Sequence, residues 1–184
     1  MARPGLFARL LPPYFKETWL LRGFAAIKIP LLFYLRPNVV ALDAERAVLR
    51  IKLRRRSRNH MGSMYLAALT AGADVASALM ALQQVRAAGA EVVPIFSDMR
   101  AEFYKRADGD VLFTCTEGET VRDMVAEVLR GEGRVGRSIK VTVTVPDKYG
   151  EEPVATFVMG LSLKLKKGAA AADAAPRPMR ASAP

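Results

Sequence analysis

The sequence predicts an α+β domain in which an antiparallel sheet wraps around one long apolar helix. The segment from Met64 to about Ala88 is rich in alanine and has the length and composition of a helix. Runs in which apolar and polar residues alternate, the pattern of strands with one buried face, occur on both sides of it. The expected order is two strands, the helix, then four strands with a short helix inserted. A sheet of this kind can bury a single apolar helix.

A hairpin is expected before the long helix, formed by residues 38–43 and 46–55. The LDAERA segment between the two runs has turn character. In the second run, apolar and basic residues alternate, so that one face is buried and the other meets water. The alternating residues are Leu49, Arg50, Ile51, Lys52, Leu53 and Arg54.

The chain after the long helix is expected to consist mostly of strands. Gly89 ends the helix, and the strand segments 91–106 and 110–117 are separated by the turn sequence ADGD. Residues 119–133 form a short amphipathic helix. A second hairpin follows, in which PDKYGEEP joins the alternating runs 139–145 and 154–167.

The two ends of the chain are expected to lie outside this domain, which spans residues 38–167. Residues 1–37 form an N-terminal amphipathic arm with a helix from Glu17 to Lys28, and residues 168–184 form a disordered tail that lacks large apolar side chains. The apolar stripe of the arm helix is expected to pack on the domain; the alternative is contact with an anionic membrane surface. The stripe consists of Trp19, Leu20, Phe24 and Ile27.

Composition excludes several classes of site and partner. The 184 residues include one cysteine, Cys115, and one histidine, His60, so an intrachain disulfide, an all-Cys metal site and a His-pair zinc site are excluded. The net charge of +10 suits an anionic partner, but no nucleic-acid-binding motif accompanies it. Charges and Pro30 interrupt the N-terminal apolar run and no cleavage site follows, so we expect a cytoplasmic protein without specific nucleic-acid binding.

Asp74 is the only formally charged residue between Arg58 and Arg86, in the middle of the apolar helix. A transmembrane helix is one interpretation, but a central aspartate costs about 2.5–3.5 kcal/mol on insertion. A structural aspartate is another, and it needs a buried partner. A functional carboxylate with a raised pKa in a pocket is the third. Small residues share its face of the helix and leave room for a ligand or for close packing: Ala67, Thr70, Ala71, Ser77, Ala78 and Ala81.

The element order and the sequence NHMGSMYLAALTAGAD resemble the hotdog-fold acyl-CoA thioesterases of the phenylacetic-acid pathway. The chain looks closest to a domain-of-unknown-function branch of that superfamily. The family pattern has an Asn, a Gly three residues later, then His-Gly-Gly, and an Asp fifteen residues after the Asn. Asn59, Gly62 and Asp74 stand at these spacings, whereas Tyr65-Leu66-Ala67 replaces His-Gly-Gly. The resemblance covers about residues 38–167.

The resemblance implies an acyl-CoA thioesterase. Asp74 would be the nucleophile or general base, and Asn59 would hold the water or the carbonyl. The backbone at Tyr65 and Leu66 would supply the oxyanion donor near the helix N-terminus. Further substrate-binding residues would be Gly62, Thr70, Phe96, Ser97 and Arg58. His60 stands beside Asn59 rather than in the triplet and is not expected to be catalytic.

The resemblance also implies partners. The substrate would be a small-molecule acyl thioester, with coenzyme A as part of the substrate and no other cofactor and no metal. The assembly would be a homodimer or a dimer of dimers, in which Phe96 and Ser97 could line the partner's pocket. Basic residues could neutralise coenzyme A phosphates: Arg54, Arg55, Arg56, Arg58, Arg134 and Arg137. A non-catalytic protein that binds an acyl chain or acyl-CoA is the alternative, motivated by the missing glycines. A dehydratase is less favoured because His60 is poorly placed.

Overall fold

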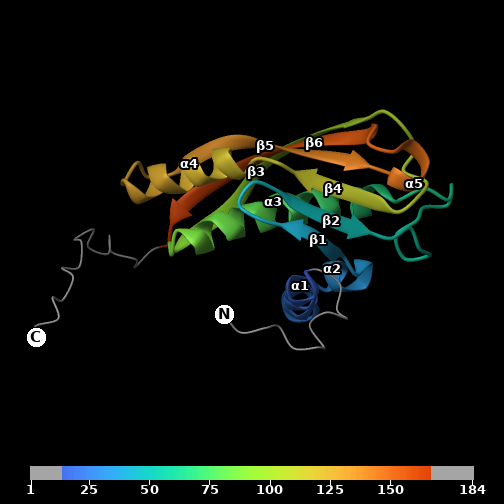
Figure 1. The fold of residues 1–184 in the computed structure, drawn as a ribbon, viewed down its shortest axis with the longest axis horizontal. Coiled ribbons are helices and arrows are strands. Elements are labelled where there is room, and N and C mark those ends of the chain that lie inside the picture. Colours follow the sequence, from blue (N-terminus) through green and yellow to red (C-terminus); the bar gives the residue numbers. More distant parts are fainter. Residues whose placement is uncertain (1–13, 167–184) are drawn as a thin grey trace, which may run out of the picture.

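The computed structural model describes residues 14–166, which form one six-stranded antiparallel sheet, a long central helix and an N-terminal pair of helices (Figure 1). The strand order across the sheet is β1-β2-β4-β5-β6-β3. The strands are β1 (Asn38–Leu42), β2 (Ala47–Ile51), β3 (Val92–Phe103), β4 (Val111–Cys115), β5 (Val135–Thr144) and β6 (Pro153–Leu165). The helices are α1 (Phe15–Lys28), α2 (Pro30–Leu35), α3 (Leu66–Ala87), α4 (Gly118–Leu129) and α5 (Pro146–Tyr149).

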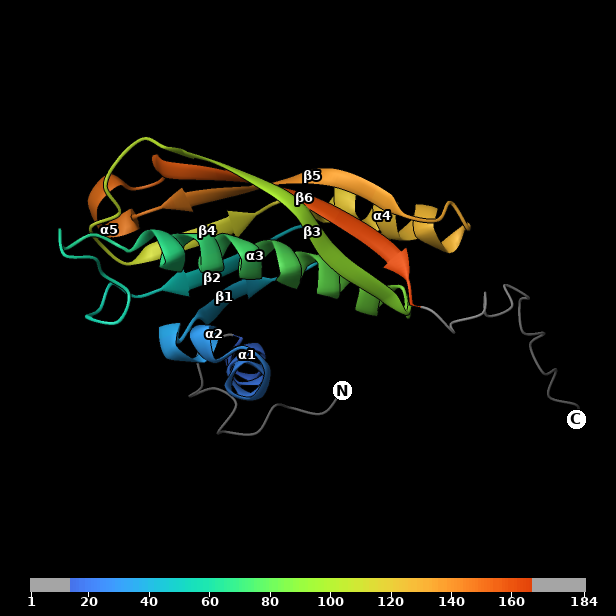
Figure 2. The same cartoon turned by 180° about the vertical axis from the view of Figure 1, so that it is seen from behind.

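Helix α3 lies along one face of the sheet, behind it in Figure 1 and in front of it in Figure 2. Its contact with the sheet is close because Gly72 has no side chain: a Cβ there would lie 2.3 Å from the ring of Phe113 on β4. Phe113 is fully buried. The expected order of strands and helices is therefore confirmed, and so is the wrapping of the sheet around one apolar helix.

The limits of α3 differ slightly from the expected Met64–Ala88. The helix begins at Leu66 because Met64 N–H donates to the Ala107 carbonyl and Tyr65 N–H to the Ser57 carbonyl, which holds both residues extended. Gly89 follows the C-terminal end with a φ of 60°. In the described part of the chain, α3 is the one helix long and apolar enough to cross a membrane, but 56% of its most apolar window is buried inside the protein. It is the helix at the centre of the fold.

Strand β2 is shorter than the expected 46–55 and ends at Ile51. Beyond it, Leu53 N–H donates to Asp110 Oδ1, and the Ser57 hydroxyl donates to the Lys52 carbonyl at 2.7 Å. The hydroxyl oxygen also accepts from Arg54 N–H at 2.9 Å. These side chains bond the backbone N–H and carbonyl groups with which a longer strand would pair to its neighbour. The chain therefore turns away from the sheet after Ile51.

The arm contains two helices rather than one, and its apolar stripe does not pack on the domain. Trp19, Leu20, Phe24 and Ile27 are 56%, 69%, 55% and 78% exposed, which contradicts that expectation. The opposite face of α1 is inward, since Thr18 and Ala25 are its buried residues. Thr18 Oγ1 accepts from Val39 N–H at 3.0 Å. Leu32 and Leu35 of the unexpected helix α2 are buried.

Strand β3 pairs with β6 over nearly its whole length and forms one edge of the sheet. A bulge interrupts this pairing between Phe96 and Met99. The β5–β6 hairpin is confirmed, with the short helix α5 in its connection. The domain limits at 38 and 167 stay predictions, and the tail at 168–184 lies outside the described residues.

Candidate functional site

A cavity of about 580 Å³ lies beside the N-terminal half of α3. One wall is the helix itself, with Asp74 as the only ionisable carboxyl group. The N-terminal arm forms another wall, and Met159 of β6 lies at the cavity as well. Apart from Asp74, its lining is apolar or weakly polar: Ile29, Leu31, Leu32, Tyr65, Leu66, Ala67, Thr70, Ala71 and Met159.

The Asp74 carboxylate is half-buried and has no partner among the residues that the structure describes. It forms no ion pair within residues 14–166, and burial alone raises its pKa above the usual aspartate range. Without a nearby cation or a hydrogen-bond donor, nothing offsets the loss of hydration. The interpretation of Asp74 as a structural residue required a buried partner, and the described residues offer none.

The N-terminus of α3 opens on the same cavity. Tyr65 is the N-cap and forms no side-chain capping bond. Among the described residues no acceptor is bonded to the N–H of Leu66 or of Ala67. Unpaired N–H groups in the first turn of a helix, together with the positive end of its dipole, attract a partial negative charge. The Leu66 side chain, which is 55% exposed, lines the approach to them.

Four of the residues singled out in the sequence therefore lie together at the cavity: Tyr65, Leu66, Thr70 and Asp74. Helical periodicity places them on one side of α3, with Ala67 and Ala71 between them. The small residues around Asp74, which are Ala67, Thr70 and Ala71, could be recognised from the sequence as sharing its face. Tyr65 and Leu66 are large and do not belong to that predicted face.

Asn59 and Gly62 lie in the turn that precedes α3, outside the cavity lining. Asn59 Oδ1 accepts from Met61 N–H at 2.9 Å and from Ser63 N–H at 3.1 Å. Gly62 has a φ of 79°, a conformation that favours glycine. Arg58 pairs with Met64 at the base of this turn and its side chain is exposed. In this chain these three residues shape the loop that leads into the helix.

Phe96 and Ser97 lie on β3, at the bulge on the sheet edge, and also outside the cavity lining. The Ser97 hydroxyl lies 2.8 Å from Asp98 Oδ2 and 3.1 Å from the Gly160 carbonyl oxygen. Phe96 is half-buried and Ser97 is exposed. Their role in lining a second subunit's pocket stays a prediction.

The sequence pattern does not indicate that the arm forms part of the cavity wall. Ile29, Leu31 and Leu32 belong to a short apolar segment at the start of α2, and nothing in their spacing indicates which surface they meet. They reach the cavity because α1 and α2 fold back against the β1 side of the domain (Figures 1 and 2). An alternating or periodic pattern gives the buried face of an element but not its tertiary neighbour.

The comparison with protein families identifies the chain. The model of the family named Domain of unknown function (DUF4442) matches residues 17–161. The chain belongs to this family. The match begins within α1, so the DUF4442 region includes most of the arm that walls the cavity. No curated protein sequence matches the chain.

Solved structures share the fold of this DUF4442 protein. A Pseudomonas aeruginosa protein of unknown function is 24% identical, with a TM-score of 0.67 over 80% of this chain and 95% of the other. Mouse thioesterase superfamily member 2 is 14% identical, with a TM-score of 0.55 over 80% and 96%. A mutant of a Staphylococcus aureus thioesterase enzyme is 13% identical, with a TM-score of 0.53 over 73% and 98%. The DUF4442 chain therefore has the hotdog fold of these structures.

Proposed function

We propose that this protein hydrolyses an acyl thioester in the cavity beside α3. The observation that carries the proposal is the arrangement along one helix of a half-buried, unpartnered carboxylate and two unpaired N–H groups, all at a mainly apolar cavity. A carboxylate with a raised pKa is a better base than an ordinary surface aspartate. The apolar lining suits an acyl chain, and the shared thioesterase fold supports the same reaction class.

In the proposed reaction, Asp74 removes a proton from a water molecule. The oxygen of that water attacks the thioester carbonyl carbon, and the resulting oxyanion accepts hydrogen bonds from the N–H groups of Leu66 and Ala67. When the tetrahedral intermediate collapses, the carbon–sulfur bond breaks and the thiolate leaves. The proton held by Asp74 returns to the thiolate, so the products are a carboxylic acid and a thiol.

The spacing along α3 favours a base over a nucleophile. Asp74 follows Leu66 by eight residues, which at 1.5 Å per residue is about 12 Å along the helix axis. A carbonyl oxygen lies about 3 Å from its N–H donor, and a bridging water adds about 3 Å on each side. These contacts reach about 9 Å, and the Asp74 side chain, which tilts toward the helix N-terminus, shortens the remaining separation. Direct attack by the Asp74 oxygen, without the bridging water, leaves a longer gap.

The test is hydrolysis of a panel of acyl-CoA esters of increasing chain length. The rate is measured from the release of free thiol. We expect turnover by the natural protein and a loss of at least about 100-fold in kcat/KM for Asp74→Asn, which keeps the shape of the side chain but cannot accept the proton. Asp123→Asn is the matched control, because Asp123 is an exposed helical aspartate on α4. Equal turnover by Asp74→Asn and the natural protein would rule out this role.

A second candidate is binding of an acyl chain or acyl-CoA without hydrolysis. The observation that favours it is the Leu66 side chain beside the unpaired N–H groups, at a position where the resembling enzymes have glycine. Calorimetric titration with an acyl-CoA distinguishes a binding protein from a hydrolase. Tight binding with no thiol release supports the binding protein, and measurable turnover of the bound ester eliminates it.

We propose a homodimer formed through β3. This strand is a sheet edge, and it carries exposed apolar side chains, including Ile95, Met99 and Phe103. An exposed apolar edge strand is a surface on which a second strand can pair. Such pairing would bring Phe96 and Ser97 close to the other copy. Light scattering measures the mass: we expect a dimer, and a monomer for Ile95→Lys combined with Met99→Lys. A natural protein that is monomeric at micromolar concentration contradicts the proposal.

A further inference from the structure

The outward face of α1 is apolar and has no partner in the described part of the protein. Leu20, Phe24 and Ile27 project from it, with Trp19 at its side, and more than half of each side chain is exposed. Trp19, Leu20 and Phe24, together with Phe15, Lys16 and Gly23, line a shallow groove of about 540 Å³. We call Trp19, Leu20, Phe24 and Ile27 the arm face. An exposed apolar patch of this kind is characteristic of an interaction surface rather than of a soluble exterior.

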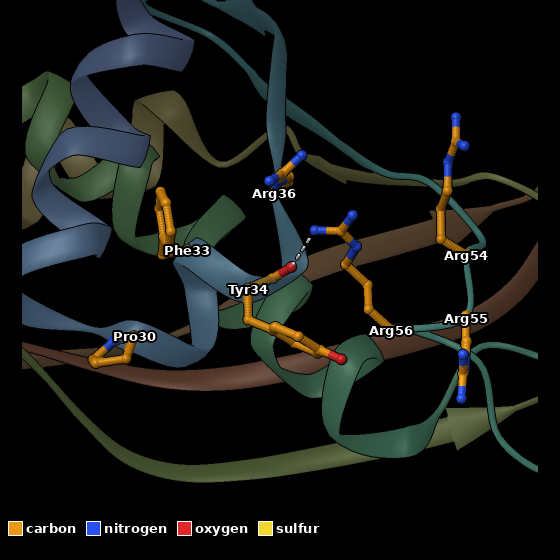
Figure 3. A pocket seen from close by; sticks show the side chains of 7 residues that line it. All are labelled: Pro30, Phe33, Tyr34, Arg36, Arg54, Arg55 and Arg56. Carbon is orange, nitrogen blue, oxygen red and sulfur yellow. Dashed lines mark hydrogen bonds between the residues drawn. The ribbon is translucent and has the colours of Figure 1, made fainter.

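A group of arginines lies next to α2. Arg36, Arg54, Arg55 and Arg56 line a hollow of about 930 Å³ together with Pro30, Phe33 and Tyr34 (Figure 3). We call these four arginines the arginine rim. None of the four guanidinium groups forms an ion pair with a carboxylate within residues 14–166. Their charge is therefore available to an external anion.

The arginine rim and the arm are held together by direct contacts. Arg56 Nη1 donates to the Tyr34 carbonyl at 3.1 Å, and its guanidinium carbon lies 5.8 Å from the centre of the Tyr34 ring. Helices α1 and α2 are joined at Ile29. Both views place α1 and α2 next to β1, and the loop after β2 leaves the sheet at the end that adjoins α2 (Figures 1 and 2). Apolar and cationic groups thus adjoin on one side of the molecule.

We propose that this surface docks on a membrane that carries anionic lipids. The arm face enters the apolar boundary of the bilayer, and the arginine rim contacts lipid phosphates beside it, the combination that interfacial amphipathic helices use. Lys16 and Lys28 are exposed on α1 and add positive charge to the same region.

The directions of the arginine side chains favour a charged surface, rather than a single phosphate ion, as the ligand of the arginine rim. In Figure 3 the side chains of Arg54 and Arg55 extend to opposite sides of their loop and do not converge on one point. A second copy of this chain fits the arm face less well than lipid does, because it would bring its own arginines and a net charge of +10 to the contact.

Docking would place the cavity near the lipid. Ile29 and Leu31 are exposed on the arm and also line the cavity beside Asp74. This consequence for substrate entry rests on the proposed hydrolysis. The docking itself does not, because it is measured without any substrate.

The test uses the full chain and its single tryptophan. Trp19 is on the arm face and is the only tryptophan in the sequence, so its fluorescence reports on this surface without labelling. We expect a blue shift of the emission and co-sedimentation with vesicles of phosphatidylcholine and phosphatidylglycerol. Binding to pure phosphatidylcholine vesicles should be at least about tenfold weaker and should not depend on salt.

Two variants separate the contributions. Arg54→Glu with Arg55→Glu removes charge from side chains that make no hydrogen bond in the described structure, and it should weaken binding to the anionic vesicles at least about tenfold. Leu20→Gln with Ile27→Gln should abolish the blue shift. The matched control is Lys140→Glu with Lys164→Glu, two exposed sheet lysines without an ion pair, which should bind as the natural protein does.

Three results would overturn the proposal: no sedimentation with anionic vesicles, equal weakening by the control pair, or an unchanged Trp19 emission on binding. A Trp19 emission that changes on dilution and not with vesicles would assign the arm face to a second copy. Inhibition of vesicle binding by inorganic phosphate at millimolar concentration, with no blue shift at any vesicle concentration, would assign the arginine rim to a free anion.

Discussion

Asp74 lies on the same side of α3 as Leu66, two helical turns further along, and both residues line one cavity. The two ends of this stretch have opposite electrostatic character. At Leu66 the helix presents unpaired N–H groups, and at Asp74 it presents a carboxylate that no residue of the described 14–166 neutralises. A helix that is otherwise apolar therefore presents unpaired N–H groups and a carboxylate to the same cavity.

The ionisation of Asp74 should cost stability. Because burial raises the pKa of this carboxyl in the folded protein, its contribution to stability is present at acidic pH and is lost as the pH rises through the folded pKa. Asp74→Asn should therefore be more stable than the natural protein at neutral pH, and this difference should vanish on acidification. Urea unfolding at several pH values measures it. A variant that is less stable at neutral pH would show that the carboxylate has a favourable partner.

The pH dependence of hydrolysis should follow the same group. A base must be ionised, so kcat/KM should fall as the pH is lowered through the raised pKa of Asp74. The inflection should lie above the pKa of an ordinary aspartate. A rate that stays constant through this acidic range while the protein remains folded would exclude Asp74 as the base.

Filling the cavity near the helix N-terminus should block substrate without unfolding the protein. Ala67 lines the cavity, and its side chain is exposed rather than packed in the core. Ala67→Leu should lower kcat/KM about tenfold or more by obstructing the approach to the N–H groups, with little change in Tm. Ala126→Leu, an exposed position on α4, is the control. Normal kinetics for Ala67→Leu would mean that substrate does not use this part of the cavity.

Gly72 should be intolerant of a side chain. A Cβ at this position would overlap the buried Phe113 ring, so Gly72→Ala should lower the free energy of unfolding by about 1–3 kcal/mol. Phe113→Leu in the same chain should recover part of the loss by making room for the methyl group. Denaturant unfolding of the single and double variants gives the coupling free energy between the two positions. Additive effects would show that the two residues do not compete for the same space.

Cys115 should react only when the protein unfolds. The side chain is buried on β4, and desolvation raises the pKa of the thiol to about 11. Both properties suppress the reactive thiolate at neutral pH. Alkylation of Cys115 should be slower in native buffer than in denaturant, by a factor comparable with the equilibrium constant for folding. Rapid native alkylation would indicate that β4 opens locally.

Much of this fold is determined by short-range patterns. Alternation predicts the β5–β6 hairpin, and alanine-rich composition predicts α3. The sequence also singles out Asp74, because a charge in a long apolar helix requires an explanation that neighbouring residues cannot supply. The spacing of small residues then predicts that Ala67, Thr70 and Ala71 share its side of the helix, and they lie at the same cavity.

The tertiary structure decides what covers these faces. A periodic pattern cannot tell that β3 pairs with β6, because backbone pairing depends on which strands meet after the chain has folded. Nor can it tell that α1 turns Thr18 and Ala25 inward: large apolar residues suggest the opposite, but close contact with β1 requires small ones. The apolar stripe of α1 therefore stays on the surface. The wall that Ile29, Leu31 and Leu32 add to the cavity depends on the same packing of the arm.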